Sequence, residues 1–117
     1  MNEDLQKKID QNALSMRKGL IEYSVMLICA NEPVYVGEIV SRLRSVDMIV
    51  VEGTLYPLLS RLASEHLMSY AWKESDSGPP RKYYELTTGG ITVLDAYKTQ
   101  WKSLRQTIER LDEGEAR

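Results

Sequence analysis

Apolar residues recur at helical spacing in the first third of the chain. Two adjacent apolar rows predict a helix that is buried on two sides, for example against its own domain and a neighbour. The rows consist of Leu20, Tyr23 and Leu27, and of Ile21, Val25 and Ile28. The helix ends at Asn31-Glu32-Pro33, because proline disfavours helical geometry in the residue before it. A weaker helical pattern continues upstream through Met16, Ile9 and Leu5. It predicts an N-terminal helical extension over residues 1–15.

Two shorter segments place apolar residues at positions i, i+3, i+4 and i+7, which predicts two helices that each bury one face. The rows are Val36, Ile39, Val40 and Leu43, and Leu55, Leu58, Leu59 and Leu62. Proline is tolerated in a first helical turn, where its missing N–H has no partner in any case. Pro57 therefore predicts that the second of these helices begins near Gly53 or Thr54. Between the two helices, the β-branched run 48–51 predicts a small strand.

Residues 67–86 change from the helical period to the alternation of a strand. Apolar and aromatic residues alternate with smaller or charged ones at Met68, Ser69, Tyr70, Ala71, Trp72 and Lys73. Residues 81–86 are also typical of a strand, and the linker 75–80 consists of turn-forming residues. The sequence therefore predicts a β-hairpin whose polar tip is flanked by Lys73, Arg81 and Lys82.

The last segment predicts a long helix with Thr87 as its N-cap. Its apolar residues are spaced 3, 4, 3, 4 and 3 apart, which is typical of a coiled-coil seam. They are Leu94, Tyr97, Trp101, Leu104, Ile108 and Leu111. A domain whose core is already built has little use for such a seam, except to meet another helix. We therefore expect residues 88–117 to form a C-terminal dimerisation helix.

This order of elements predicts an α+β fold that is mainly helical, the winged helix-turn-helix, over residues 1–87. In that fold the third helix enters the major groove of DNA and the hairpin reaches the flanking backbone. The side chains expected to bind DNA are Thr54, Tyr56, Ser60, Arg61, Lys73, Arg81 and Lys82. Two subunits joined by the terminal seam would read the two half-sites of a palindrome.

Composition and charge modify this interpretation. The chain has 117 residues, enough for one compact domain, and a formal net charge of −2, which argues mildly against nucleic acid. However, acidic residues crowd the two ends, and the local field matters more for docking than the total charge. Charged residues interrupt every apolar run, residues 1–10 lack the core of a signal peptide, and Cys29 has no disulfide partner. These features predict a cytoplasmic protein.

The sequence offers no chemistry for catalysis. No nucleophile–base–acid set, phosphate-binding glycine loop or metal-ligand spacing occurs, and His66 is the single histidine. We therefore expect no enzyme activity, no catalytic residue, no metal and no cofactor. Cys29 follows a row of apolar residues and is expected to be a small core residue.

Two segments together carry a family resemblance. The first is Glu52-Gly53-Thr54-Leu55-Tyr56-Pro57-Leu58-Leu59-Ser60-Arg61-Leu62, and the second is Gly78-Pro79-Pro80-Arg81-Lys82-Tyr83-Tyr84-Glu85-Leu86-Thr87. They resemble the recognition helix and the wing of PadR-like regulators, and Arg17 with Gly19-Leu20-Ile21-Glu22 is similar to the start of the family's first helix. The resemblance covers nearly the whole chain, and the single terminal helix resembles the short-tailed branch. It implies a dimeric repressor that is sometimes released by a small aromatic or drug-like ligand.

The chain departs from the family pattern at two places. It has Val36-Gly37-Glu38-Ile39 where the family often has Gly-Tyr-Glu-Ile, and His66 where a glycine usually ends the recognition helix. Histidine tolerates a left-handed backbone poorly, although better than a branched residue does.

Several positions keep two interpretations. Tyr56 contacts DNA or packs on the wing, Arg61 is a contact or a plain surface residue, and the hairpin cations bind phosphate or line a solvated edge. Tyr97 and Trp101 pack in the dimer seam or line a pocket between subunits for a flat aromatic ligand. The rival function is a winged-helix dimer for protein interaction or ligand sensing that does not bind DNA.

Overall fold

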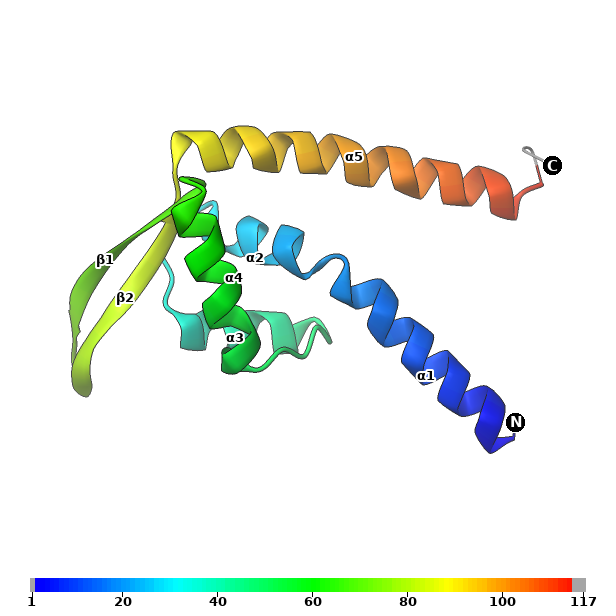
Figure 1. Cartoon of the computed structure of the whole chain (residues 1–117), viewed down its shortest axis with the longest axis horizontal. Coiled ribbons are helices and arrows are strands. Elements are labelled where there is room, and N and C mark those ends of the chain that lie inside the picture. The colour runs from blue at the N-terminus through cyan, green and yellow to red at the C-terminus, as the bar shows by residue number, and fades with distance from the viewer. Residues whose placement is uncertain (1, 115–117) are drawn as a thin grey trace.

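The computed structural model describes residues 2–114, and it forms five helices and a two-stranded sheet over that range (Figure 1). The elements are α1 (Glu3–Lys18), α2 (Ile21–Cys29), α3 (Val36–Ser45), α4 (Glu52–Ser64), β1 (Met68–Ser75), β2 (Gly78–Leu86) and α5 (Thr88–Asp112). Residues 1 and 115–117, the outer ends of the predicted extension and of the predicted dimerisation helix, lie outside it. The predicted winged helix-turn-helix, mainly helical with a hairpin wing, is confirmed.

One hydrophobic core joins α2, α3, α4, the base of the hairpin and the first turns of α5. Its buried side chains are Val25, Met26, Cys29, Val34, Val36, Ile39, Leu43, Val50, Leu55, Leu59, Leu62, Met68, Tyr84 and Leu94. The predicted rows on α3 and α4 supply much of this core, because apolar residues at i, i+3, i+4 and i+7 share one face of a helix. Cys29 is buried as expected.

The predicted first helix is two helices. α1 ends at Lys18, and α2 begins at Ile21 after Gly19 and Leu20. Glycine is a poor residue inside a helix, and the amide of Leu20 closes a turn onto the carbonyl of Arg17 at 2.9 Å. The two helices also differ in environment, because α1 contributes no buried residue and α2 contributes three.

The strand predicted at residues 48–51 is wrong. This stretch is an irregular connection between α3 and α4, in which Val50 enters the core while Ile49 and Val51 stay exposed. A β-branched run forms a strand only where a neighbouring strand supplies hydrogen bonds, and the single isolated bridge of the described region lies elsewhere. It pairs Val34, before α3, with Tyr84 of the hairpin through backbone bonds of 3.0 and 2.7 Å.

The start of α4 differs slightly from the prediction. The helix begins at Glu52, so Pro57 is its sixth residue and lies beyond the first turn. An amide at position 57 would have bonded the carbonyl of Gly53, four residues earlier, and proline cannot supply it. Both residues are exposed, so water can reach the Gly53 carbonyl instead.

The hairpin is an antiparallel pair with Lys73 opposite Arg81 and Trp72 opposite Lys82. Its base packs on the core through Met68 and Tyr84, and its far end projects from the body as a wing (Figure 1). The Ser75 hydroxyl donates to the carbonyls of Gly78 and Pro79, which fixes the tip.

The joint between the wing and α5 is tight. The Thr87 hydroxyl accepts a hydrogen bond from the Gly90 amide at 3.0 Å and donates one to the His66 carbonyl, so the predicted N-cap is confirmed. A Cβ added to Gly90 would lie 2.0 Å from the Leu67 carbonyl oxygen. Glycine at position 90 therefore lets the first turn of α5 approach the backbone at Leu67, directly before β1.

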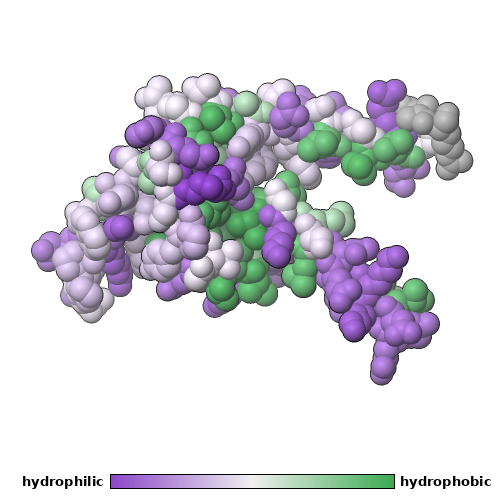
Figure 2. Space-filling model, in the orientation of Figure 1, coloured by the Kyte–Doolittle hydropathy of each residue, from purple (hydrophilic) through white to green (hydrophobic). Residues whose placement is uncertain are grey.

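Helices α1 and α5 project from the body and diverge (Figure 1). The radius of gyration is 17.3 Å, against roughly 13 Å for a compact domain of this length. From Trp101 to Leu111 the seam residues of α5 are 41–63% exposed. Figure 2 shows apolar side chains gathered on the face of α5 that turns toward α1. A single subunit therefore leaves a large apolar surface in water.

Candidate nucleic-acid interface

A groove of about 510 Å³ runs between the N-terminal half of α4, the start of α3 and the wing. Its lining consists of Tyr35, Val36, Gly37, Glu52, Tyr56, Trp72, Pro80, Arg81 and Lys82. The groove thus brings together three residues that the sequence analysis assigned to DNA binding, Tyr56, Arg81 and Lys82. It combines two cations, tyrosine hydroxyls and the N-terminus of α3, all of which are groups that bind phosphate.

The cations of the wing lie against aromatic rings. The Arg81 guanidinium is 4.4 Å from the ring centre of Tyr35, and the Lys82 ammonium is 4.3 Å from that of Tyr70. The Lys73 ammonium is 5.0 Å from the ring centre of Tyr83. Cation–π contacts of this length hold a charged head in place while its outer side remains accessible.

Lys73 and Arg81 form a cross-strand pair of like charge. Like charges directly opposite each other destabilise a sheet. This pair therefore lowers the stability of the hairpin. Local features that cost stability are expected at functional sites. The pair therefore marks this part of the wing as a candidate site for an anion.

Tyr35 is a groove residue that the sequence analysis missed. A Cβ added to Gly37 would lie 2.7 Å from the Tyr35 ring, so this ring covers the space where a side chain at position 37 would emerge. The family often has tyrosine at the position of Gly37. In this chain the ring of Tyr35 occupies the space beside Gly37 instead. The sequence feature that could have indicated Tyr35 is its position two residues before Gly37, where the chain departs from the family pattern.

The other predicted residues of α4 do not share the groove. Ser60 is exposed on α4, and Thr54 lines a separate hollow beside the end of α1 and the connection 47–51. Lys73 lies on the wing outside the lining of the groove. The seven predicted residues therefore form a central group of three with the remainder around or away from it.

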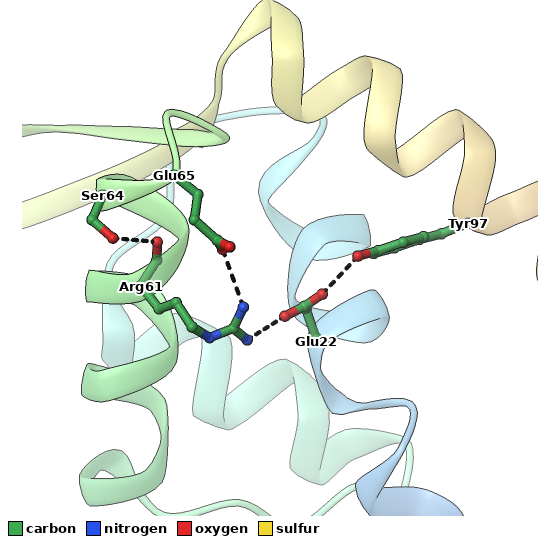
Figure 3. A network of polar contacts seen from close by, with 5 residues as sticks. All are labelled: Glu22, Arg61, Ser64, Glu65 and Tyr97. Atoms are coloured by element: carbon green, nitrogen blue, oxygen red, sulfur yellow. Dashed lines mark hydrogen bonds and ion pairs between the residues drawn. The ribbon is translucent and has the colours of Figure 1, made fainter.

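Arg61 lies in the last turn of α4, outside the lining of the groove. Its guanidinium donates to Glu22 of α2 and, at 3.1 Å, to Glu65 (Figure 3). The hydrogen bond to Glu22 and the charge of that carboxylate raise the pKa of Arg61. The guanidinium, whose planar N–H groups could bind a phosphate, is already paired with two carboxylates.

Tyr97 and Trp101 line a second hollow, of about 260 Å³, at the junction of α1, α2 and α5. The remaining lining residues are Gly19, Leu20, Glu22, Tyr23, Gln100 and Leu104. The Tyr97 hydroxyl donates to Glu22 at 2.9 Å, and its ring meets that of Tyr23 edge-on. The hydrogen bond to Glu22, followed by burial, raises the pKa of Tyr97.

The predicted dimerisation residues divide between two environments. Leu94 is buried in the core of its own chain, so it is not available to a partner, and Tyr97 is half-buried at the border. Core packing takes Leu94 because the first turns of α5 lie on α2 and on the base of the wing. The exposed part of the seam consists of Trp101, Leu104, Ile108 and Leu111.

Residues 2–114 were also compared with the requirements of a metal site, a membrane span and a reactive cysteine. No group of three or more histidine, cysteine or acidic side chains is arranged to hold a metal ion there. No helix in the same range has the length and apolar character needed to cross a membrane. Cys29 is a buried core residue, and burial raises the pKa of its thiol to about 12, which disfavours the reactive thiolate.

Comparison with solved structures places this arrangement among known regulators. A crystal structure of a PadR family transcriptional regulator from Eggerthella lenta is similar at a TM-score of 0.87 and 30% identity, over 96% of this chain and 98% of that one. A PadR-like transcription factor from Bacteroides fragilis is 48% identical, with a TM-score of 0.72, over 83% and 94% of the two chains. A PadR-like transcriptional regulator from Bacillus cereus is 36% identical, with a TM-score of 0.75, over 83% and 95%.

Comparison of the sequence alone leads to the same family. Over 65 residues the chain is 28% identical to an uncharacterized protein from Lysinibacillus sphaericus, and the match spans 56% of this chain and 60% of that protein's length. The model of the transcriptional regulator PadR-like family matches residues 25–96, which include α3, α4, the wing and the start of α5. The chain therefore belongs to the PadR-like family of transcriptional regulators.

Proposed function

We propose that this protein represses transcription as a homodimer that binds a palindromic DNA operator. Each subunit inserts the side of α4 that carries Tyr56 and Ser60 into the major groove and lays its wing along the neighbouring backbone. The observation that carries the proposal is the groove between α4 and the wing, where Tyr56, Arg81 and Lys82 line one surface. Arg81 and Lys82 bind phosphate, the Tyr56 hydroxyl donates to phosphate, and the exposed Ser60 faces base edges. Thr54 and Lys73 lie at the margin of this contact.

The dimer rests on the exposed seam of α5. A two-fold axis brings Trp101, Leu104, Ile108 and Leu111 of one subunit against the same residues of the second. This contact covers apolar surface that a single subunit leaves in water, and it sets two copies of α4 at a fixed separation. Trp101→Asp would bury a charge in that contact, so we expect monomers in sedimentation velocity. A dimer that persists with this substitution would contradict the assignment.

We further propose that a small, flat aromatic ligand binds beside Tyr97 and Trp101 and releases the DNA. The hollow at these residues is lined by aromatic and aliphatic side chains, as sites for such ligands are. In a Trp72→Phe background, Trp101 is the single remaining tryptophan. Titration with ethidium should then quench its fluorescence, and no quenching up to saturating dye would count against the site.

DNA binding is tested by fluorescence anisotropy with labelled duplexes at several salt concentrations. The duplexes are a sequence selected from a random pool by the wild-type protein and an unrelated duplex of equal length. We expect preferential binding to the selected duplex, with an affinity that falls as salt rises. Replacing Arg81 and Lys82 by alanine should weaken binding to both duplexes and reduce the salt slope by roughly one for each phosphate that the variant no longer neutralises.

Lys102→Ala is the matched control, because this lysine is exposed on α5, away from the groove. It should change neither affinity nor salt slope by a comparable amount. If the wild-type dimer fails to bind any duplex at low salt, DNA binding is not its function. A winged-helix dimer for protein interaction, which the net charge of −2 favours, would then be the better interpretation.

A further inference from the structure

The Glu22 carboxylate connects three helices (Figure 3). Glu22 lies in the first turn of α2, and one of its oxygens accepts a hydrogen bond from Arg61 of α4. The other oxygen accepts a hydrogen bond of 2.9 Å from the Tyr97 hydroxyl of α5. Arg61 is also tied to Glu65, one turn further along its own helix, at 3.1 Å. A single acidic side chain thus bonds the recognition helix on one side and the dimerisation helix on the other.

This arrangement differs from an ordinary surface ion pair. The side chain of Glu22 is only 27% exposed, and both of its oxygens have partners that lie 39 and 75 residues away in the sequence. Isolated ion pairs on a surface contribute little to stability, because water screens them and long side chains lose freedom. A carboxylate held in a network of directional, charge-assisted hydrogen bonds fixes geometry instead. The geometry fixed here is the placement of α4 relative to α5.

We propose that Glu22 is a positioning residue for DNA recognition, which holds α4 through Arg61 and α5 through Tyr97. The inference rests on the proposed function, in which α4 reads a half-site and α5 joins the two subunits. Because the separation and orientation of the two copies of α4 depend on how each is set on its α5, Glu22 selects the spacing between half-sites. Arg61 then serves recognition from the side of α4 that meets α2, without touching DNA.

The position of Arg61 along α4 separates this role from phosphate binding. Arg61 lies five residues beyond Tyr56, roughly 7.5 Å further along the helix axis. Tyr56 lines the groove against the wing, whereas Arg61 lies on the side of α4 that meets α2. A residue that binds phosphate contributes to the salt dependence of affinity, and a residue that positions a helix does not. The two roles therefore give different results in one titration.

The experiment uses Glu22→Gln, which keeps the size of the side chain and removes its charge. Affinity is measured by anisotropy on the duplex selected by the wild type and on duplexes with one or two base pairs added between its half-sites. We expect affinity for the selected duplex to fall about three- to tenfold, with an unchanged salt slope. We also expect the difference between spacings to shrink, because α4 is no longer held at one angle to α5.

Two controls bracket this result. Glu65→Gln removes the other partner of Arg61 and leaves the link between α4 and α5, so it should keep the wild-type preference for spacing. Arg81→Ala should lower affinity at every spacing together and reduce the salt slope. Circular dichroism and sedimentation show whether each variant is a folded dimer. If Glu22→Gln does not fold, Tyr97→Phe replaces it, because this change removes one hydrogen bond of Glu22 and keeps the ring.

Each outcome decides the proposal. A weaker preference for spacing at a constant salt slope supports it. An unchanged preference in a folded Glu22→Gln or Tyr97→Phe dimer overturns it, even though the DNA-binding function would stand. A changed salt slope in Glu22→Gln also overturns it, because Arg61, released from the carboxylate, would then lie close enough to DNA to act as a phosphate contact. A wild-type dimer that binds no duplex would refute the proposed function itself and this inference with it.

Discussion

Helices α4 and α5 each carry a row of apolar residues at helical spacing, but only the row of α4 is covered along its whole length. The four leucines of the α4 row lie in or against the core, and Leu55, Leu59 and Leu62 are fully buried. On α5, Leu94 is buried, Tyr97 is half-buried, and the row is exposed from Trp101 onward. The difference arises because α4 lies between α3 and the wing, whereas α5 runs past the end of the body (Figure 1).

The comparison shows what a periodic pattern can and cannot predict. A row of apolar residues predicts that one face of a helix is to be covered, because exposing it to water costs free energy. It does not predict which surface covers it. On α4 the cover comes from the same chain, whereas on α5 the described part of the chain leaves the row exposed from Trp101 onward.

The largest expected difference between the two rows follows from one substitution made on each. Leu59→Ala leaves a cavity in a closed core, so we expect it to lower the free energy of unfolding by about 2–5 kcal/mol at any protein concentration. Leu104→Ala removes the same atoms from an exposed position, so it should change the unfolding of a dilute, monomeric chain little and weaken assembly instead. Urea unfolding at several protein concentrations separates the two effects. Equal, concentration-independent losses would refute the comparison.

The joint between the two regions gives the next largest effect. Gly90→Ala would bring a Cβ onto the Leu67 carbonyl, which is backbone and cannot turn aside. We expect a loss of about 1–3 kcal/mol in the free energy of unfolding, as for other overpacked sites. Gly89→Ala is the matched control, because its Cβ would lie at an ordinary 3.6 Å from the His66 carbonyl. Thermal denaturation of both variants should show destabilisation at position 90 alone.

Much of the fold could be predicted because local rules and tertiary packing agree there. The rows on α3 and α4, the alternation of the hairpin and the Thr87 cap each found the environment that their pattern implies. The strand at 48–51 was wrong because β-branched residues need a partner strand, and the chain places none beside them. The break at Gly19 was missed because the apolar period continues across it.

The candidate site was predicted less well, since it depends on which segments meet in space. Arg81, Lys82 and Tyr56, which the charge of the wing and the exposed side of the third helix indicated, do line one groove, and their contact with DNA stays a prediction. Arg61 belongs to the same helix as Tyr56, but its guanidinium donates to Glu22, 39 residues earlier in the chain. No spacing in the sequence relates these two residues. For the same reason the role of Glu22 emerges only from the packed helices.

Alkaline pH is expected to lower the free energy of unfolding through ionisation of the Cys29 thiol. Burial raises the pKa of this thiol to about 12 in the folded chain, above the ordinary value of an unfolded cysteine, about 8.5. The folded state therefore favours the protonated thiol, and this contribution is fully present below pH 8.5 and is lost as pH rises toward 12. The slope is at most about 1.4 kcal/mol per pH unit. Urea unfolding of Cys29→Ala at pH 8 and pH 10 should show a smaller loss than that of the wild type.

The smallest effect concerns how the two helices end. Both end with a left-handed residue, which is Gly114 after α5, at a φ of 82°, but His66 after α4, at a φ of 61°. The amides of His66 and Leu67 close onto the carbonyls of Ala63 and Leu62, so the backbone of α4 must adopt this conformation. A Cβ is strained there and glycine is not, so we expect His66→Gly to raise the free energy of unfolding by about 0.5–1 kcal/mol. Asp47→Gly, at the equivalent end of α3, is the comparison and should gain less, because aspartate tolerates the left-handed region better than histidine does. A loss of stability in His66→Gly, measured by thermal denaturation, would mean that the imidazole makes contacts worth more than the strain it imposes.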